Sequence, residues 1–564
     1  MCHAVYQILV WLWMLLCCCG SRVSCLQISN CNKTEVTMIR DMDVLTSLTL
    51  SNCSLPHLEN AFFMRFGQLL HLELEHSGLS SLDDFSLHGL PRLQSLSLSH
   101  NNLTKLRSWS SEPLEALTSL DLSHNRLCSL EDNSFVLYPQ LQMLNLASNQ
   151  IEQLADDTFH GLSHLKHLQL HGNRLMLIDG FQFSGLHRLS SLTLHHNLIK
   201  GVDPLAFESN THLRSLRLEG NLLSSLQFLT QRGLARLVHL NLANNLLQKL
   251  EPQGFGNNIE LQDLVLSHNN LTELTKESLL GLDSLERLNI SHNILSHIEA
   301  ESLQSVVSLT QIDASFNQIA SLSESLFQAN SQLEEIILSH NRIEEISPKL
   351  MSHQTHLKRL KLDGNALIEA NFLQSLPPAL NRLSLSVDLS SNLLHSVNLS
   401  SLLQFGHINL ADNHWNCAWL VKNFLLRAPA SLNFARNWSL LSDWNEDLTK
   451  VQGIDCIEGS RNRSIVLLSV GEAIHSKVQC AQSYDELNPA PPPLTWPKIP
   501  TDRFDSRSVI IWMLVAIAIT FACLRWLRRF VDRKEQSKRK LKAINEVYMS
   551  KMESQPIRHE RERS

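Results

Sequence analysis

The chain has 564 residues, with 48 Lys and Arg against 55 Asp and Glu, which gives a net charge of −7. This acidic balance provides no excess of basic surface for nucleic acid, so we expect no nucleic-acid partner. The sequence contains no Gly-rich phosphate loop, no H-E-x-x-H motif and no G-x-S-x-G motif, so we expect no catalytic activity and no cofactor.

Residues 1–22 are expected to form a signal peptide. The segment "ILVWLWMLLCCC", from Ile8 to Cys19, is about 12 apolar residues long and precedes "GSRVS". Such a run is too short to span a bilayer. The chain is therefore expected to enter the secretory route, where disulfides form and persist.

Residues 45–413 consist of about 16 repeats with a period of 24 residues. Each repeat reads L-x-x-L-x-L-x-x-N-x-L, and its alternating part predicts a short strand with one buried face. The Asn positions are Cys53, Ser77, Asn101, Asn125, Asn149, Asn173, Asn197, Asn221, Asn245, Asn269, Asn293, Asn317, Asn341, Asn365, Asn392 and Asn413. The last two steps are 27 and 21 residues, so the register slips once and recovers. A fixed period of this length indicates a solenoid.

Two further features of the repeats predict how the solenoid is held together. A large apolar residue stands ten residues after the Asn position, and these residues are expected to stack as a second buried spine. They are Phe63, Leu87, Phe135, Phe159, Phe183, Phe207, Phe255, Leu279, Leu303, Phe327 and Met351. Each Asn amide is expected to bond turn backbone groups of its own and neighbouring repeats, because buried backbone polar groups need partners.

The repeat pattern resembles the leucine-rich repeat family in its 24-residue extracellular form. The resemblance implies an α/β solenoid shaped like a horseshoe, with a parallel sheet on its concave face. It also implies caps that shield the exposed ends of the solenoid. We assign residues 23–44 to the N-terminal cap and residues 414–481 to a C-terminal cysteine cap.

The cysteines predict disulfides in both caps. Cys25 and Cys31 are expected to form a short N-terminal bridge. The family's C-terminal cap implies a pair between Cys417 and Cys456, and Cys480 is then unpaired or bridges a second chain, since Trp419 stands where the family has a cysteine. A pair between Cys456 and Cys480 is the alternative.

Two cysteines within the repeats, Cys53 and Cys128, are interpreted as small buried residues. Eight N-x-S/T motifs lie outside the predicted membrane segment, and several of them are expected to carry sugar. Their acceptors are Asn32, Asn52, Asn102, Asn270, Asn289, Asn398, Asn437 and Asn462.

The C-terminal part of the chain predicts a membrane anchor. Residues 482–507 are Pro-rich and read as a semi-rigid stalk. Residues 508–527 are apolar except for Ser508, Thr520 and Arg525, and they are expected to form one transmembrane helix. Residues 528–564 form a basic tail, and the chain from residue 525 onward carries 13 Lys and Arg against 6 Asp and Glu. Positive charge after the span places the tail in the cytosol, so we expect a single-pass type I protein of the plasma membrane.

The concave strands supply the candidate partner-binding residues, since a curved sheet of free side chains is the surface with which such solenoids hold partners. These candidates are Arg217, Glu219, Arg287, Asp313, Phe316, Glu335, Ile337, Arg359, Lys361 and Asp363. Phe316 and Ile337 are expected to be neighbouring apolar anchors. His171 and His195 lie at equivalent positions of adjacent repeats, where they are tolerated surface residues, sense pH or share a metal ion.

These features together predict a non-enzymatic recognition protein of the cell surface. Its expected partner is an extracellular protein or another leucine-rich repeat protein, and a homodimer or heterodimer is compatible with the sequence. The alternative is a carrier or complex-forming protein that is shed or secreted, for example in innate immunity.

Overall fold

The computed structural model describes residues 25–39, 42–106, 113–398, 402, 404–416, 419, 432–433, 449–451 and 454–456. These residues belong to one compact unit of the chain, Met1–Gln482. The expected signal peptide, stalk, transmembrane segment and cytosolic tail lie outside the described residues. Within the described ranges, no helix is both long and apolar enough to cross a membrane.

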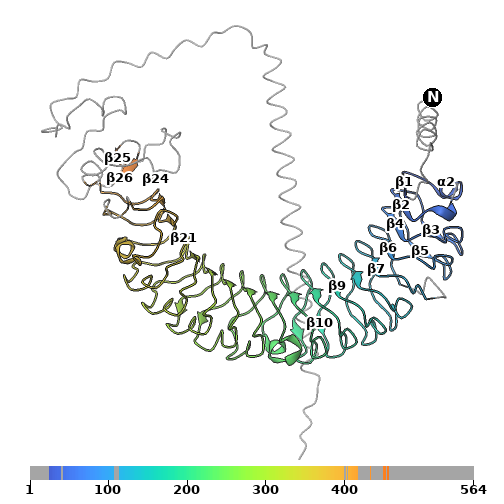
Figure 1. Cartoon of the computed structure of the whole chain (residues 1–564), viewed down its shortest axis with the longest axis horizontal. Helices are drawn as coiled ribbons and strands as arrows, with labels where there is room; N and C mark the ends of the chain where they lie inside the picture. The colour runs from blue at the N-terminus through green and yellow to red at the C-terminus, as the bar shows by residue number, and fades with distance from the viewer. Residues whose placement is uncertain are drawn as a thin grey trace, which may run out of the picture. The chain divides into compact units, whose positions relative to one another are not determined.

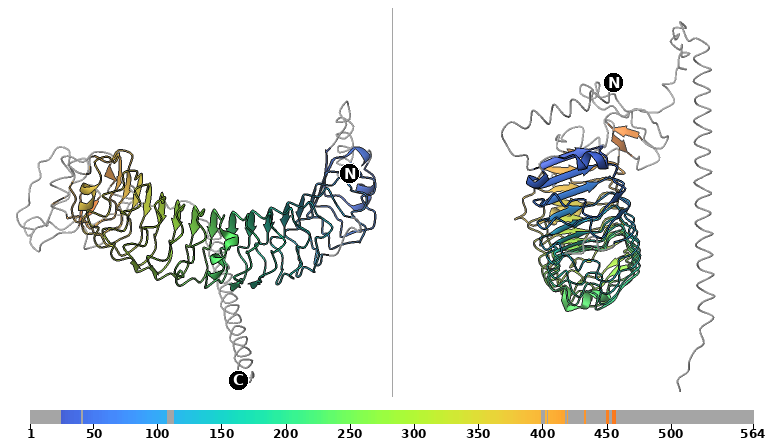
Figure 2. Two further views of the ribbon diagram at one scale, coloured as in Figure 1. Left: turned by 60° about the horizontal axis from the view of Figure 1, so that its bottom comes forward. Right: turned by 90° about the vertical axis from the view of Figure 1, so that its right-hand side faces the viewer.

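The described unit is built around one parallel sheet of 18 strands, which lies along the inner side of the curved coil (Figure 1, Figure 2). Each strand pairs with the next one along the coil. In pairing order they are β1 (Cys25–Ser29), β2 (Ser47–Ser51), β4 (His71–Glu75), β6 (Ser95–Ser97), β7 (Ser119–Asp121), β8 (Met143–Asn145), β9 (His167–Gln169), β11 (Ser191–Thr193), β13 (Ser215–Arg217), β14 (His239–Asn241), β15 (Asp263–Val265), β17 (Arg287–Asn289), β19 (Gln311–Asp313), β20 (Glu335–Ile337), β21 (Arg359–Lys361), β22 (Ser386–Asp388), β23 (His407–Asn409) and β24 (Leu432–Asn433). The predicted parallel-sheet solenoid is confirmed.

The rest of each coil consists mainly of turns. Three small parallel sheets join neighbouring coils away from the main sheet, and a fourth small sheet is antiparallel. They are β3 (His57–Leu58) with β5 (Ser81–Leu82), β10 (Leu177–Ile178) with β12 (Gly201–Val202), β16 (Glu273–Leu274) with β18 (His297–Ile298), and β25 (Thr449–Val451) with β26 (Ile454–Cys456). The described helices are α2 (Lys33–Thr37) and the 3₁₀ turns Met42–Val44, Gln227–Thr230, Arg232–Leu234 and Asn371–Ser375. Fewer residues are therefore helical than the expected α/β solenoid suggests, because turns and not helices connect one strand of the main sheet to the next.

Two stacks of apolar side chains form the core. The leucines of the repeat pattern are buried, and so is every residue of the predicted second spine. Within that spine the rings of Phe135, Phe159, Phe183 and Phe207 stack with centroids 6.0, 6.0 and 5.8 Å apart. A single coil cannot bury these side chains, so neighbouring coils stabilise one another.

The Asn ladder holds successive coils in register. Asn149 Nδ2 donates to the carbonyl of Leu122 in the preceding coil at 3.0 Å and to that of Leu146 in its own coil at 3.1 Å. Its Oδ1 accepts from the backbone N–H of Leu127 at 3.0 Å. The same contacts recur along the repeats, so the predicted role of the Asn positions is confirmed.

The register slip leaves this ladder intact. Asn392 Nδ2 still donates to the Leu362 carbonyl at 2.9 Å, and its Oδ1 accepts from the Leu367 N–H at 3.1 Å. The coil between Asn365 and Asn392 contains the 3₁₀ turn Asn371–Ser375, which takes up part of its longer path. The three extra residues therefore lie in the turns and not in the sheet.

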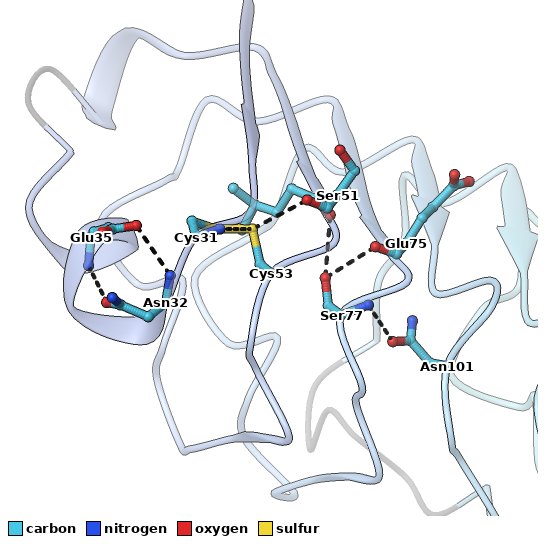
Figure 3. Close-up of a disulfide and its surroundings, with 9 residues drawn as sticks. Cys31, Asn32, Glu35, Ser51, Cys53, Glu75, Ser77 and Asn101 are labelled. Carbon is cyan, nitrogen blue, oxygen red and sulfur yellow. Dashed lines mark hydrogen bonds between the residues drawn. A yellow bond between two sulfur atoms is a disulfide. The ribbon is translucent and has the colours of Figure 1, made fainter. Parts of the chain in front are cut away.

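The N-terminal disulfide differs from the prediction. Cys31 pairs with Cys53, with Cα atoms 4.4 Å apart (Figure 3). Cys25 begins β1 and Cys31 follows the end of that strand, so about six residues of extended chain, roughly 20 Å, separate them. A disulfide requires Cα atoms within about 7 Å, and the expected bridge between Cys25 and Cys31 is therefore wrong.

The register of β1 explains the correct pair. Cys25 lies opposite Ser47 and Ser29 lies opposite Ser51, an offset of 22 residues that also places Cys31 beside Cys53. Cys31 thus occupies the Asn position of the cap coil, and the two cysteines join that coil to the first repeat. Cys53 is buried as expected, but it is a disulfide cysteine and not an inert core residue.

The other cysteine predictions have different outcomes. Cys128 was expected to be buried, but its thiol is exposed and lies 3.4 Å from the carbonyl oxygen of Arg126. Cys417 and Cys480, together with the side chain of Cys456, lie outside the described residues. The pairing of these three cysteines therefore stays a prediction.

Candidate functional site

The concave surface is formed by side chains that folding does not use. In each three-residue strand the middle residue is buried, whereas the first and third point away from the core. Seven of the ten predicted partner-binding residues are such strand residues: Arg217, Arg287, Asp313, Glu335, Ile337, Arg359 and Lys361. Glu219 and Asp363 lie two residues after their strands, just before the turn.

Charged side chains pair across neighbouring strands of this surface. Arg287 and His239 both contact the carboxylate of Asp263, which lies between them. The hydrogen bond that Arg287 donates to Asp263 raises the pKa of Arg287 above its usual value. Arg359 Nη1 lies 2.7 Å from Glu335 Oε1. These ion pairs join side chains of neighbouring strands across the concave surface.

Phe316 lies elsewhere than predicted. It is not on a strand but directly precedes Asn317 in the turn, with φ +54°. Its ring is 44% exposed and stacks between His292 and His340, with centroids 4.3 Å from each. Ile337 lies on β20, facing the concave side. The expected pair of neighbouring apolar anchors is thus split between the strand surface and the turn.

The residue before the Asn position has a left-handed backbone throughout the repeats. Thirteen described coils place a residue other than Gly there with φ between +51° and +56°: Asn52, His76, His100, His124, Ser148, His196, Asn244, His268, His292, Phe316, His340, Ser391 and Asp412. Gly172, Gly220 and Gly364 take the same position with φ near +69°. The sequence signal for this left-handed conformation is the Gly that recurs at the same repeat position. The interpretation of the histidines as tolerated surface residues did not include this backbone conformation.

These turn residues form columns of stacked rings. The short ring column contains His76, His100 and His124, with centroids 4.3 and 4.1 Å apart. The long ring column contains His268, His292, Phe316 and His340. Desolvation and then the neighbouring His268 lower the pKa of His292. Because the ring faces cover one another, the columns present mainly ring edges to solvent.

A third group lies at the middle of the concave surface. This central cluster consists of His171, His195, Arg217 and Glu219. The rings of His171 and His195 stack with centroids 4.3 Å apart, and His195 Nδ1 lies 3.9 Å from Glu219 Oε1. Arg217 Nε donates to the same Glu219 oxygen at 2.9 Å. Desolvation lowers the pKa of His195 to about 4, against the opposing effect of Glu219, so His195 is neutral near pH 7.

The ring geometry argues against a metal ion shared by His171 and His195. A bound metal lies near the plane of each ligating ring, about 2.1 Å from its nitrogen. The two ring planes differ by only 7° and are stacked, so one ion cannot lie in both. Over the described part of the chain, no group of three or more His, Cys, Asp or Glu side chains could hold a metal ion.

The sugar acceptors occupy several surroundings. Asn52 and Asn270 are exposed in turns, and Asn32 caps α2 by accepting from the Glu35 N–H at 3.1 Å. Asn289 lies on the concave strand β17, where its Oδ1 accepts from the Ser291 hydroxyl at 2.7 Å. The remaining acceptors are Asn102 and Asn398 in described turns and Asn437 and Asn462, which lie outside the described residues.

Comparison with known proteins agrees with this architecture. The family model "Leucine rich repeat" matches residues 43–103, 115–175, 172–223, 259–319 and 315–367. The chain belongs to the leucine-rich repeat family. A comparison with curated proteins finds no match.

Three solved structures illustrate the similarity of this chain to proteins with the same fold. A Leptospira interrogans leucine-rich repeat protein is 24% identical, with a TM-score of 0.52 over 61% of this chain and 84% of that one. Drosophila Toll, in its complex with Spatzle, is 18% identical, with a TM-score of 0.58 over 71% and 62%. TLR13, in its complex with ssRNA13, is 26% identical, with a TM-score of 0.53 over 72% and 59%. The match thus spans less than two thirds of the Toll and TLR13 chains.

Proposed function

We propose that this chain is a non-enzymatic recognition protein of the cell surface, which binds a protein partner through the concave face of its repeats. The main support is that each repeat uses separate residues for its core and for its concave surface. Leucines and Asn positions are buried in the core and the ladder, whereas the strand residues between them carry varied charged and apolar side chains. Folding does not require that variety, so a partner is the simplest reason for it.

The proposed location is the plasma membrane, with the repeats outside the cell. It is supported by the apolar segment in residues 8–19, the apolar segment 508–527 and the excess of positive charge after it. The disulfide between Cys31 and Cys53 is compatible with an oxidising compartment. Sugar at some of the eight acceptor sites belongs to the same proposal.

A protein partner is favoured over nucleic acid. TLR13 is a neighbour whose solved complex contains ssRNA13, so nucleic acid is a natural alternative to consider. Residues 25–416 of this chain, however, carry 24 Lys and Arg against 39 Asp and Glu, a net charge of −15. Nucleic-acid binding draws most of its affinity from cations that neutralise phosphates, and this balance opposes it.

A shed or secreted form is the second candidate. The Pro-rich segment 482–507 lies between the repeats and the apolar segment, where cleavage would release the whole repeat region. Detection of the repeat region in the culture medium of cells that express the full chain would favour this form. Its retention on the cells would favour the anchored receptor or adhesion protein.

The proposed function can be tested by a binding screen. Cells that display the full-length chain are probed with a panel of labelled extracellular proteins, and each positive partner is then measured against concave-face variants. We expect at least one partner whose affinity depends on strand residues such as Ile337 and Lys361. Partners whose affinity depends only on the outer turns would contradict the proposal.

A further inference from the structure

The central cluster differs from the rest of the concave face in the residue types at one position of the repeat. It lies two residues before the Asn position, where the strand meets the turn. Eleven of the sixteen repeats have Ser or Ala there, and ten of these eleven small residues are buried. The five exceptions are Glu75, His171, His195, Glu219 and Asp363. Three of them stand in consecutive coils, so large ionisable side chains gather where the fold normally places a small one.

The three carboxylates at this position differ in their partners. Glu75 Oε1 accepts from the hydroxyls of Ser97 and Ser99 in the next coil, at 3.2 and 3.0 Å. Asp363 accepts from the Ser339 hydroxyl of the preceding coil. Glu219 is 7% exposed, and Arg217 bonds only its Oε1, while its buried Oε2 has no hydrogen-bond partner. An unpaired oxygen of a buried carboxylate costs folding free energy, so this arrangement is not explained by stability.

His195 adds a second unpaired atom to the same place. Its Nδ1 is buried without a hydrogen-bond partner, 3.9 Å from Glu219 Oε1. In the described part of the chain, the other buried side-chain atoms without partners lie away from the strands. The buried atoms of the concave face that lack a hydrogen-bond partner, His195 Nδ1 and Glu219 Oε2, therefore lie together at its middle.

Arg217 shows which chemistry suits the site. Its guanidinium already donates to Glu219 Oε1, although the Arg217 side chain is about half exposed. The orphaned oxygen is an acceptor, and a neutral imidazole offers one acceptor nitrogen as well. A ligand with several N–H donors on a positive charge satisfies both, and the net charge of −15 on residues 25–416 attracts it.

We propose that Glu219 and His195 form a pocket for an arginine or lysine side chain of the protein partner, which opens when Arg217 moves aside. This inference rests on the proposed function, since it names the chemistry of the partner at the concave face. The incoming cation replaces the bond that Arg217 makes to Glu219 Oε1, and it adds the bond to Oε2 that Arg217 leaves unmade. A partner carboxylate is disfavoured because it would bring a second negative charge beside Glu219.

The test compares two isosteric variants of the full-length chain, Glu219→Gln and Glu75→Gln. Both remove one negative charge from the same repeat position, but only the first removes the orphaned oxygen. Hexa-arginine, hexa-glutamate and an uncharged Gly-Ser hexapeptide serve as probes, and calorimetry on the purified chain measures their affinities. We expect Glu219→Gln to weaken hexa-arginine binding about tenfold or more, and Glu75→Gln to change it less than about twofold.

A second variant keeps the test decisive if Glu219→Gln folds poorly, as thermal melts would show. Arg217→Ala removes an exposed side chain, and we expect it to strengthen hexa-arginine binding because the pocket then stands open. Equal weakening by Glu219→Gln and Glu75→Gln, weaker binding after Arg217→Ala, or tighter binding of hexa-glutamate than of hexa-arginine would each overturn the pocket. The proposed function would be contradicted by a different result, namely that no protein partner has an affinity that changes in the concave-face variants.

Discussion

At the residue scale, the Asn positions carry the fold and the residues beside them are available for function. Asn317 Nδ2 reaches the carbonyls of Ile290 and Ala314 at 3.0 and 3.1 Å, and its Oδ1 accepts from the Leu295 N–H at 3.0 Å. Phe316, the preceding residue, has a left-handed backbone and an exposed ring. Two adjacent residues therefore have opposite importance for stability.

This contrast gives the first prediction. We expect Asn317→Ala to lower the free energy of unfolding by about 3 kcal/mol, because several buried backbone groups lose a partner. Asn317→Asp is also expected to destabilise, since its carboxylate cannot donate to the two carbonyls. Phe316→Gly should cost less than about 1 kcal/mol, because relief of backbone strain at φ +54° offsets the lost ring contacts. Thermal and denaturant melts measure all three, and equal losses at the two positions would contradict the ladder.

The second prediction concerns pH. The pKa of His195 is about 4 in the folded chain and about 6.5 in an unfolded one. Between these values the unfolded state binds the proton and the folded state does not, so stability falls as the pH is lowered through 6.5 and the loss levels off below about 4. At pH 5 this single group should cost on the order of 2 kcal/mol relative to pH 7.

Melts at pH 7 and pH 5 test this effect through His195→Gln. The variant should lose less stability than the parent over the same interval, whereas His167→Gln, which removes an exposed histidine of β9, should behave like the parent. An identical pH response of His195→Gln and the parent would show that His195 titrates normally in the folded chain.

At the element scale, the structural features that recur in every coil could be predicted from the sequence. Features that occur in a single coil could not. The period of 24 located the strands, the Asn ladder and the Phe spine, because each follows from one position recurring in every coil. The partner of Cys31 was missed because the cap coil is offset by 22 residues and not 24. The unpaired oxygen of Glu219 could not be predicted either, since it depends on where Arg217 places its guanidinium.

The cap disulfide carries the third prediction. Joint replacement of Cys31 and Cys53 by Ser should lower stability by about 3 kcal/mol, as expected for a closed loop of roughly 22 residues. Cys128→Ser, at an exposed thiol, should change stability by less than about 0.5 kcal/mol. Peptide mapping without reduction should recover the peptides of Cys31 and Cys53 joined, and recovery of Cys25 joined to Cys31 would contradict the structure.

At the scale of the whole molecule, the proposed topology makes the fourth prediction. A tag at the C-terminus of the full chain should be detected only after cells are permeabilised, because positive charge follows segment 508–527. Treatment with an N-glycosidase should raise the mobility of the same chain on a gel. Staining of the tag on intact cells would refute the orientation, and an unchanged mobility would count against the acceptor sites.

The central claim is that a partner binds the concave face, and two matched triple variants test it most directly. The concave set is Ile337→Glu and Lys361→Glu on the strands, together with Phe316→Ala in the turn that follows strand β19. The outer set makes the same kinds of change at exposed positions away from the main sheet: Phe181→Ala, Val307→Glu and Lys349→Glu.

The measurement is the affinity of each variant, as the full-length chain on cells, for a partner found in the screen. Melts of the same variants confirm that both fold. The account predicts that the concave set weakens binding about tenfold or more while the outer set stays within about twofold of the parent. Full affinity in the concave set, together with a loss in the outer set, would contradict the claim.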